Sequence, residues 1–278
     1  MLLVASLGWV TSAQSALIDF NTAGDLDTHF DGNWVTTDDF DEADGVGIGA
    51  TRALGVVSDI VGGTDDAGAT LVTSNYRFGS PGAKIAVSAY FHTVAQLGTA
   101  GEDRVFELNL VGSSANVPTA AHTGIGGKIE FVPNADGNDS IGIEFRRNNA
   151  DVAGSQTPDA SAFDIKSSTW YKATFTATNA GAGNSIPATM VLDEYSADGT
   201  SLVTAGVFSH SFDIPAGDIS IDPEVWAAFR VRNGTRLYNA IDNFETVQLV
   251  IPEPASVALV GLAVVGFLAI RRSAGAMR

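Results

Sequence analysis

The chain has 278 residues, of which 45% are hydrophobic and 17% charged, and its 32 acidic against 15 basic residues give a net charge of −17. A charge of this sign repels nucleic acid and anionic lipid, so the composition excludes a nucleic-acid-binding protein. The absence of cysteine excludes a disulfide framework, a thiol nucleophile and a thiolate metal site.

The first sixteen residues, Met1 to Ala16, have the composition of a secretion signal. An apolar run at 1–10 precedes small residues, and Ala13 and Ser15 take the minus-three and minus-one positions of a cleavage site. No Lys or Arg precedes the apolar run, so we expect an incomplete signal whose native start lies further upstream. The alternative is that 1–10 forms a buried first strand.

Residues 17–249 suit one large all-β domain better than two small ones. They show no long stretch of 3.6-residue periodicity, whereas strand-like alternation is frequent. Residues 84–94 and 104–111 each alternate apolar side chains with polar ones. The apolar members are Ile85, Val87, Ala89, Phe91, Phe106, Leu108 and Leu110.

Residues 127–147 read as two strands joined by a turn at Asn134 to Asn138, where Asp136 and Gly137 suit a tight connection. Four further strands are predicted at Tyr171 to Thr178, Thr189 to Tyr195, Val225 to Arg232 and Ala240 to Leu249. Such a series of strands with Gly-rich and Asn/Asp-rich links predicts an antiparallel β-sandwich.

Two pairs of sequence stretches refine this prediction. "WYKATFTATN" at Trp170 to Asn179, followed by "ATMVLDEYSADGTSL", resembles a strand pair of laminin G-like and concanavalin-like sandwiches. "LIDFN" at Leu17 to Asn21 and "AIDNFE" at Ala240 to Glu245 are similar to the first and last strands of such domains. The resemblance implies a jelly roll and says little about activity.

The same resemblance suggests a metal site. In jelly-roll carbohydrate-binding modules the first and last strands lie together and often share a structural calcium ion, and Asp19 and Asp242 stand between apolar neighbours on those two strands. Carboxylate and carbonyl oxygens suit calcium. We therefore expect a calcium ion held by Asp19 and Asp242 with loop carbonyls; the alternative is two solvated carboxylates at strand ends.

A glycan-binding surface needs aromatic platforms and planar polar groups on one exposed face. By alternation, eight such side chains fall opposite the apolar rows of their strands. They are Tyr90, His92, Glu107, Asn109, Glu144, Arg146, Trp226 and Arg230. We expect them to line a glycan-binding sheet if their strands are neighbours; the alternative is the polar outer surface that every sandwich has.

Catalysis lacks support in the sequence. Concanavalin-like glycoside hydrolases carry a Glu-x-Asp-x-x-Glu arrangement on one strand, and this chain contains none. The histidines are scattered, and no HExxH or Gly-x-Ser-x-Gly motif is present. The acidic runs at 37–45 and 134–139 lack the spacing of an EF-hand calcium loop and suit solvated loops. We predict a protein without enzymatic activity, with a glycoside hydrolase and a purely structural matrix protein as alternatives.

The C-terminal stretch, 250–278, contains sixteen uncharged residues from Ala255 to Ile270. As a helix this run is roughly 24 Å long against a hydrocarbon core of ~30 Å, which makes it a marginal membrane span. Arg271 and Arg272 follow it directly, which favours a cytoplasmic C-terminus. The alternative, a buried last helix of the soluble domain, conflicts with a run that is apolar on all sides.

Pro252, Glu253 and Pro254, the apolar run, and then Arg271 and Arg272 resemble the PEP-CTERM sorting signal of exported bacterial proteins. The resemblance implies export, transient retention in the inner membrane and recognition by an exosortase-type membrane protease. It also implies a final location in the cell envelope or extracellular matrix of bacteria that make an exopolysaccharide or biofilm. We therefore expect a signal peptide at 1–16, a jelly-roll domain at 17–249 and a sorting segment at 250–278, with exopolysaccharide as a candidate ligand.

Overall fold

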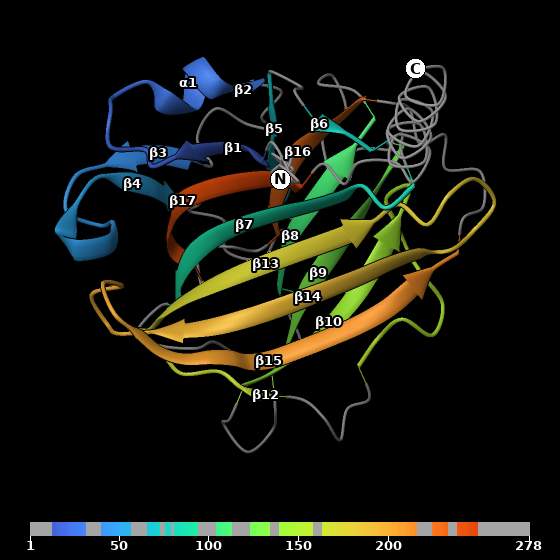
Figure 1. The fold of residues 1–278 in the computed structure, drawn as a ribbon. Helices are drawn as coiled ribbons and strands as arrows, with labels where there is room; N and C mark the ends of the chain where they lie inside the picture. The colour runs from blue at the N-terminus through green and yellow to red at the C-terminus, as the bar shows by residue number, and fades with distance from the viewer. Residues whose placement is uncertain are drawn as a thin grey trace, which may run out of the picture.

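Two antiparallel sheets stacked face to face make up the described part of the chain (Figure 1). The computed structural model describes residues 13–31, 40–56, 66–72, 76–78, 81–93, 104–112, 123–133, 139–157, 163–215, 224–232 and 238–249. Within these segments the helices are α1 (Asp25–His29) and the 3-10 turn η1 (Ile48–Ala50). The predicted antiparallel β-sandwich is confirmed.

The first sheet, called sheet A, contains eight strands in the described segments. Its order is β15 (Leu202–Ile214), β14 (Ile186–Tyr195), β13 (Trp170–Thr178), β7 (Lys84–Thr93), β17 (Tyr238–Leu249), β4 (Ala53–Val56) and β3 (Phe40–Ala43), and β1 (Ala13–Ile18) also pairs with β17. The two ends of the domain therefore lie side by side, since Ile18 of β1 stands opposite Phe244 of β17.

The second sheet, sheet B, contains nine strands in the described segments. Its order is β11 (Ala150–Asp151), β10 (Asp139–Arg147), β9 (Gly124–Pro133), β8 (Arg104–Val111), β16 (Glu224–Arg232), β5 (Asp66–Leu71) and β2 (Phe30–Asp31), with β12 (Phe163–Asp164) paired to β10 and β6 (Tyr76–Arg77) to β16. Strand β16 lies beside β8 although more than a hundred residues separate them, so long crossovers build this sheet.

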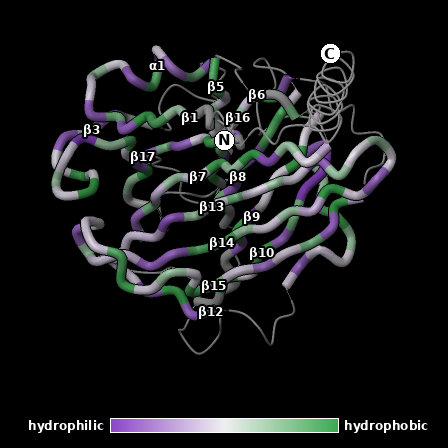
Figure 2. Tube along the Cα trace, in the orientation of Figure 1, coloured by the Kyte–Doolittle hydropathy of each residue, from purple (hydrophilic) through white to green (hydrophobic). Residues whose placement is uncertain are grey.

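Alternating side chains explain why these segments form strands that face a common core. In β13, Ala173, Phe175 and Ala177 are fully buried, whereas Thr174 and Thr176 between them are partly exposed. The hydropathy along the central strands alternates in the same way (Figure 2). Because side chains of a strand point to opposite faces in turn, each central strand buries one row of side chains between the sheets.

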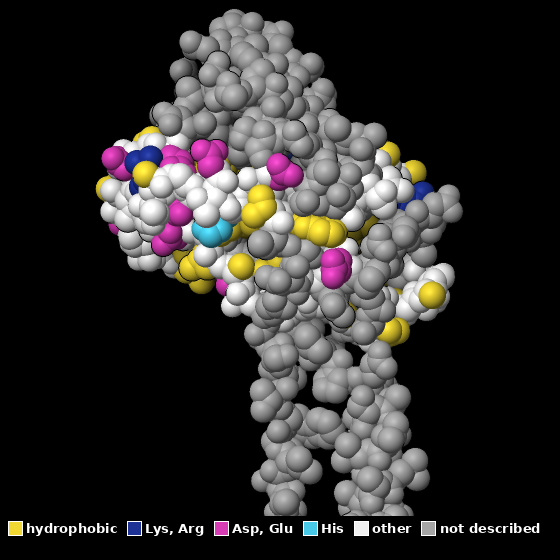
Figure 3. Space-filling model, turned by 90° about the horizontal axis from the view of Figure 1, so that it is seen from above, with side chains coloured by type: hydrophobic (Ala, Val, Ile, Leu, Met, Phe, Trp, Pro, Cys, Tyr) yellow, Lys and Arg dark blue, Asp and Glu magenta, His cyan; other side chains and the backbone are white. Residues whose placement is uncertain are grey.

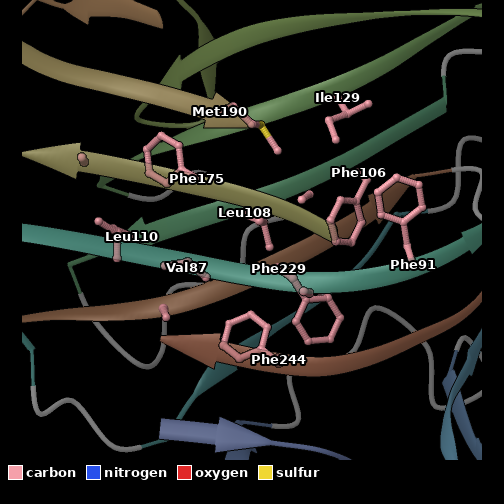
Figure 4. Close-up of a cluster of buried hydrophobic side chains, with 14 of the residues drawn as sticks. Val87, Phe91, Phe106, Leu108, Leu110, Ile129, Phe175, Met190, Phe229 and Phe244 are labelled. Atoms are coloured by element: carbon pink, nitrogen blue, oxygen red, sulfur yellow. The ribbon is translucent and has the colours of Figure 1, made fainter. Parts of the chain in front are cut away.

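The core between the sheets is rich in aromatic side chains (Figure 4). Phe91 of β7 and Phe106 of β8, one from each sheet, approach to 5.1 Å between ring centroids. A β-carbon built on Gly127 of β9 would lie 2.6 Å from the Met190 sulfur on β14, so a larger residue there would require the Met190 side chain to shift. This packing is what holds a chain without disulfides together.

The predicted strands at 84–94, 104–111, 171–178, 189–195, 225–232 and 240–249 are present, and the two strands expected within 127–147 pair as β9 and β10. Strand β15 had not been predicted. Its first half lies on the edge of sheet A with Leu202 and Val203 about half exposed, at 52% and 57%, so no alternating buried face marks it in the sequence.

Two sequence expectations concern segments near the N-terminus. Strand β1 begins at Ala13, inside the segment assigned to the signal peptide, and the cleavage point stays a prediction. The acidic run at 37–45, expected to be solvated, includes the partly buried Glu42, whose carboxylate accepts the backbone N–H groups of Gly24 and Leu26 at 2.7 Å. Glu42 therefore caps α1. Burial alone would raise the pKa of Glu42, but the two N–H groups and Arg52 outweigh burial, so the pKa is lowered.

Candidate functional site

Six of the eight predicted glycan-binding residues lie on one surface, the outer face of sheet B. They are Glu107 and Asn109 on β8, Glu144 and Arg146 on β10, and Trp226 and Arg230 on β16. Their strands are joined through β9, so the condition set by the sequence, that these strands be neighbours, is met for six residues.

Four charged side chains of this face form a row across the central strands. Arg230 stands directly opposite Glu107, Glu107 opposite Lys128, and Lys128 opposite Glu144. Directly opposed residues on a sheet face have their β-carbons about 5 Å apart, so each charge in the row has a neighbour of opposite sign. We call these four residues, together with Arg146, Glu130, Asp151 and Asn109, the sheet B polar cluster.

Glu107 is the centre of the sheet B polar cluster. It is 1% exposed, and its Oε1 accepts hydrogen bonds from Arg146 Nη1 at 2.5 Å and from Arg230 Nη1 at 3.0 Å. A buried carboxylate is tolerated when it is paired and hydrogen-bonded. The two guanidinium groups therefore fix the Glu107 carboxylate in place and turn one of its oxygens toward themselves.

Lys128 of β9 sits among three carboxylates. Its Nζ lies 2.7 Å from Glu144, 3.2 Å from Asp151 and 3.3 Å from Glu130. Burial lowers the pKa of Lys128, but the hydrogen bond from its ammonium to Glu144 and the charges of the other two carboxylates outweigh burial and raise the pKa above its ordinary value. Lys128 is therefore a fixed cation, and its own partners neutralise it.

A tight turn completes the cluster. Asn148 and Asn149 both have positive φ, 51° and 59°, as a two-residue type I′ hairpin requires. This turn places Asp151 opposite Arg146, whose Nε lies 3.2 Å from the Asp151 carboxylate and whose Nη2 donates to the Asn149 carbonyl at 2.6 Å. Asn is the non-glycine residue that tolerates this conformation best, which explains the local sequence.

Buried side-chain atoms of the cluster without a hydrogen-bond partner in the described structure include one carboxylate oxygen and one amide nitrogen, in addition to Nε of Arg146, which lies 3.2 Å from Asp151 without forming a hydrogen bond. The oxygen is Oε2 of Glu107 and the nitrogen is Nδ2 of Asn109, and both residues are 1% exposed. A buried polar atom without a partner costs about 1–3 kcal/mol, and folded proteins rarely leave one without a functional or structural reason. This pair is the strongest indication of a binding site in the part of the chain that the structure describes.

Tyr90 and His92 lie on the other side of the molecule, on the outer face of sheet A. The Tyr90 hydroxyl is 3.1 Å from that of Tyr195, the Lys172 ammonium lies 5.4 Å from the centre of the Tyr90 ring, and His92 contacts the ring of Trp170 at 5.1 Å. Burial and then Tyr195 raise the pKa of Tyr90, and burial lowers the pKa of His92. These two residues therefore do not share a surface with the sheet B polar cluster.

Sequence reasoning missed Lys128, Glu130 and Asp151. The alternation of "GKIEFVP" puts Lys128 and Glu130 on the face opposite Ile129, which is a signal that the sequence contained. Asp151 gave no such signal, because only the turn at Asn148 brings it back beside β10.

The two candidate calcium ligands do lie near each other, at the junction of β1 and β17. Asp242 is 1% exposed; its Oδ2 accepts the Ile48 N–H at 2.9 Å and its Oδ1 accepts the Asn243 N–H at 2.7 Å. Burial, and to a lesser degree the charge of Asp19, raises the pKa of Asp242 to about 6, although the two N–H groups lower it. The pKa of Asp19 is lowered by its hydrogen bonds with Asn21.

Asp19 and Asp242 are hard oxygen donors of the type that calcium takes, but calcium needs six to eight such oxygens. Both oxygens of Asp242 already accept backbone N–H groups. Within the described segments, no three His, Cys, Asp or Glu side chains are grouped so as to hold a metal ion. The residues therefore supply only part of a calcium site, and calcium binding stays a prediction.

The sorting residues, Pro252, Glu253, Pro254, Arg271 and Arg272, lie outside the described residues, as does the predicted C-terminal helix. No helix within the described segments combines the length and the apolar character that crossing a lipid bilayer requires. On the face shown in Figure 3, most of the acidic side chains that can be seen lie toward the left side of the view, and two others stand apart nearer its middle.

Comparison with known proteins agrees with both sequence resemblances. Residues 250–273 match the PEP-CTERM protein-sorting motif, which indicates an exported, secreted protein. No curated protein sequence matches the chain.

Solved structures resemble the sandwich. The seed lectin of Lotus tetragonolobus is 13% identical with a TM-score of 0.50 over 86% of this chain and 100% of the lectin. The basic winged bean lectin, solved with Tn-antigen, is 12% identical with a TM-score of 0.50 over 87% of this chain and 100% of the lectin. Alginate lyase Aly36B is 13% identical with a TM-score of 0.46 over 85% of this chain and 97% of the lyase. The chain thus carries a PEP-CTERM sorting motif behind a sandwich similar in fold to the legume lectins.

Proposed function

We propose that this chain is an exported, non-enzymatic protein of the cell envelope or extracellular matrix that binds a glycan of the exopolysaccharide on the outer face of sheet B. The observation that carries the proposal is the pair of buried polar atoms, Glu107 Oε2 and Asn109 Nδ2, which have no partner in the described structure. Sugars are dense in hydroxyl groups, so a bound glycan would supply both missing hydrogen bonds.

The surroundings of this pair suit a glycan. Planar groups that orient sugars, two guanidinium groups and several carboxylates, are already fixed by ion pairs at 2.5 to 3.3 Å, so ordering them on binding costs little entropy. Trp226 on β16 is partly exposed on the same face and offers an aromatic surface. The lectins similar in fold support the proposal only as an analogy.

The sorting motif supplies the route. In the proposed sequence of events the chain is exported, held for a time in the inner membrane by the apolar run that follows Pro254, and released by an exosortase-type protease. The match at 250–273 supports the route.

Mass spectrometry of the protein recovered separately from membranes and medium of its native host tests the route. A released form that ends near Pro252 to Pro254 is the expected result, whereas full-length protein found only in the membrane would indicate a plain anchor and reject sorting.

Binding is tested by affinity electrophoresis of the full-length chain in gels containing the host exopolysaccharide. We expect retardation of the wild type, and retention of that retardation by Tyr90→Phe, a change on the outer face of sheet A. Unretarded migration in every polysaccharide gel would reject glycan binding and favour the purely structural alternative.

A glycoside hydrolase is the second candidate, because Glu107 and Glu144 occur on one face. Hydrolysis needs one carboxyl group that gives up a proton and one that acts as base or nucleophile. Glu107 accepts hydrogen bonds from two arginines and Glu144 pairs with Lys128, so both carboxylates are held by protein cations, an arrangement that favours binding over hydrolysis. Release of reducing ends from the polysaccharide by wild type, but not by Glu107→Gln, would overturn this part of the proposal.

A further inference from the structure

We infer that Glu107 and Asn109 form a subsite that recognises two adjacent hydroxyl groups of a neutral sugar and rejects uronic acids. The inference rests on the proposed function and narrows it to one ligand chemistry. It is carried by the chemical difference between the two buried atoms, one of which only accepts hydrogen bonds and the other only donates them.

The two atoms belong to neighbouring positions of the same face. Glu107 and Asn109 are two residues apart on β8, so both side chains point outward, and their backbone positions are about 7 Å apart. Two side chains that converge from that separation can reach two oxygens on neighbouring carbons of one sugar ring. The subsite is therefore the size of one monosaccharide.

A diol satisfies both atoms at once. One hydroxyl donates its proton to Glu107 Oε2, and the next accepts the Asn109 Nδ2 proton. A uronic acid also has adjacent hydroxyl groups, but it brings a carboxylate close to the Glu107 carboxylate. That contact between like charges at a buried site is unfavourable.

The cations of this face whose side chains the structure describes, Arg146, Arg230 and Lys128, contact carboxylates of the protein. Arg146 and Arg230 both contact Glu107 Oε1, and Arg146 also lies 3.2 Å from Asp151. Lys128 is surrounded by its three carboxylate partners. These three cations thus face four carboxylates, Glu107, Glu130, Glu144 and Asp151, so the described cluster carries one more negative than positive charge.

The backbone of β9 positions the Asn109 amide. Gly126 stands directly opposite Asn109, and a β-carbon built on Gly126 would collide with the amide oxygen of Asn109. The amide therefore lies across β9 in the space that a side chain would take. On β16, the strand on the other side of β8, Ala228 stands opposite Asn109. Trp226 lies two residues before Ala228 on the same face and is therefore a diagonal neighbour of Asn109. Diagonal positions are about 7–8 Å apart, a distance that an aromatic side chain can span.

Affinity electrophoresis of the full-length chain in gels of defined polysaccharides tests the inference. A 4-linked galactomannan presents free adjacent hydroxyls along its backbone, a β-1,3-glucan has none on its internal residues, and polygalacturonate has them together with a carboxylate. We expect the dissociation constant for galactomannan to be at least tenfold lower than that for either of the other two.

Variants separate the subsite from general effects on the fold. Asn109→Leu removes the donor while keeping the volume, and replacing a buried amide that has no hydrogen-bond partner for its nitrogen should leave folding intact, so we expect at least tenfold weaker galactomannan binding. Gly126→Ala should weaken binding similarly by displacing the amide. Thr176→Val, on the outer face of sheet A, is the matched control and should bind as wild type does.

The outcomes distinguish the inference from the proposed function. Equal or tighter binding of polygalacturonate or β-1,3-glucan, or unchanged binding by Asn109→Leu, overturns the diol subsite and leaves glycan binding standing. Failure of the wild type to bind any polysaccharide overturns both. Glu107→Gln removes the negative charge and should raise polygalacturonate binding relative to galactomannan; an unchanged ratio would also overturn the subsite.

Discussion

Replacing Asp242 by asparagine should change how the stability of the protein depends on pH. The Asp242 carboxyl group is 1% exposed, and burial raises its pKa from 3.8 to about 6. The native state therefore binds a proton at a higher pH than the unfolded chain does. The stabilisation from that proton is complete below about pH 4 and is lost as the pH rises through 6.

The size of the effect follows from the interval between 3.8 and about 6. At ~1.36 kcal/mol per pH unit this interval corresponds to about 3 kcal/mol of unfolding free energy. The asparagine side chain of the variant does not ionise, so the variant lacks this contribution. Its amide turns an NH₂ group toward one of the two backbone N–H donors, from Ile48 and Asn243, which lowers stability by an amount that is the same at every pH.

Urea unfolding of wild type and Asp242→Asn between pH 4 and pH 8, in a chelator, measures the difference. The wild type should lose about 3 kcal/mol relative to the variant as the pH rises across this window. Asp213→Asn, a change at an exposed position of β15, is the control and should run parallel to wild type. Parallel curves for Asp242→Asn and wild type would refute the argument that this carboxylate is buried at a cost.

Three further predictions concern the metal, the cluster and the core. If Asp19 and Asp242 hold calcium, calcium chloride at 100-fold the dissociation constant should stabilise the wild type by about 2.7 kcal/mol relative to chelator. Asp19→Asn should abolish this stabilisation, and a melting temperature that calcium leaves unchanged in calorimetry would reject the calcium site. Glu107→Ala leaves Arg146 and Arg230 buried without their common carboxylate and should cost about 3–5 kcal/mol in urea unfolding, so a loss under ~1 kcal/mol would contradict the pairing. Phe229→Ala removes a fully buried ring that packs at 5.4 Å on Phe30 and 5.7 Å on Phe244, and should cost about 3–5 kcal/mol; a near-neutral result would mean that this part of the core is not packed as described.

The sequence by itself determined most of the long strands and which of their side chains face the core. Phe106, Leu108 and Leu110 turned inward because side chains on a strand alternate between two faces, and that rule needs no knowledge of the neighbouring strand. The sorting segment was readable for a similar reason, since 250–273 is recognised as a linear motif and needs no partner strand. Strand β15 was not predicted because Leu202 and Val203 lie on an open edge of the sheet, where no buried face requires apolar and polar residues to alternate.

Only the tertiary structure decided which strands are neighbours, and with them the candidate site. Glu107 meets Arg146 from 39 residues away and Arg230 from 123 residues away, while Tyr90, equally outward-facing, lies on the other sheet. Alternation fixes the face of a side chain within its strand, but pairing between distant strands depends on how the whole chain packs its core. The burial of Glu107 and Asn109, and the two polar atoms that they leave without partners, arise from that packing.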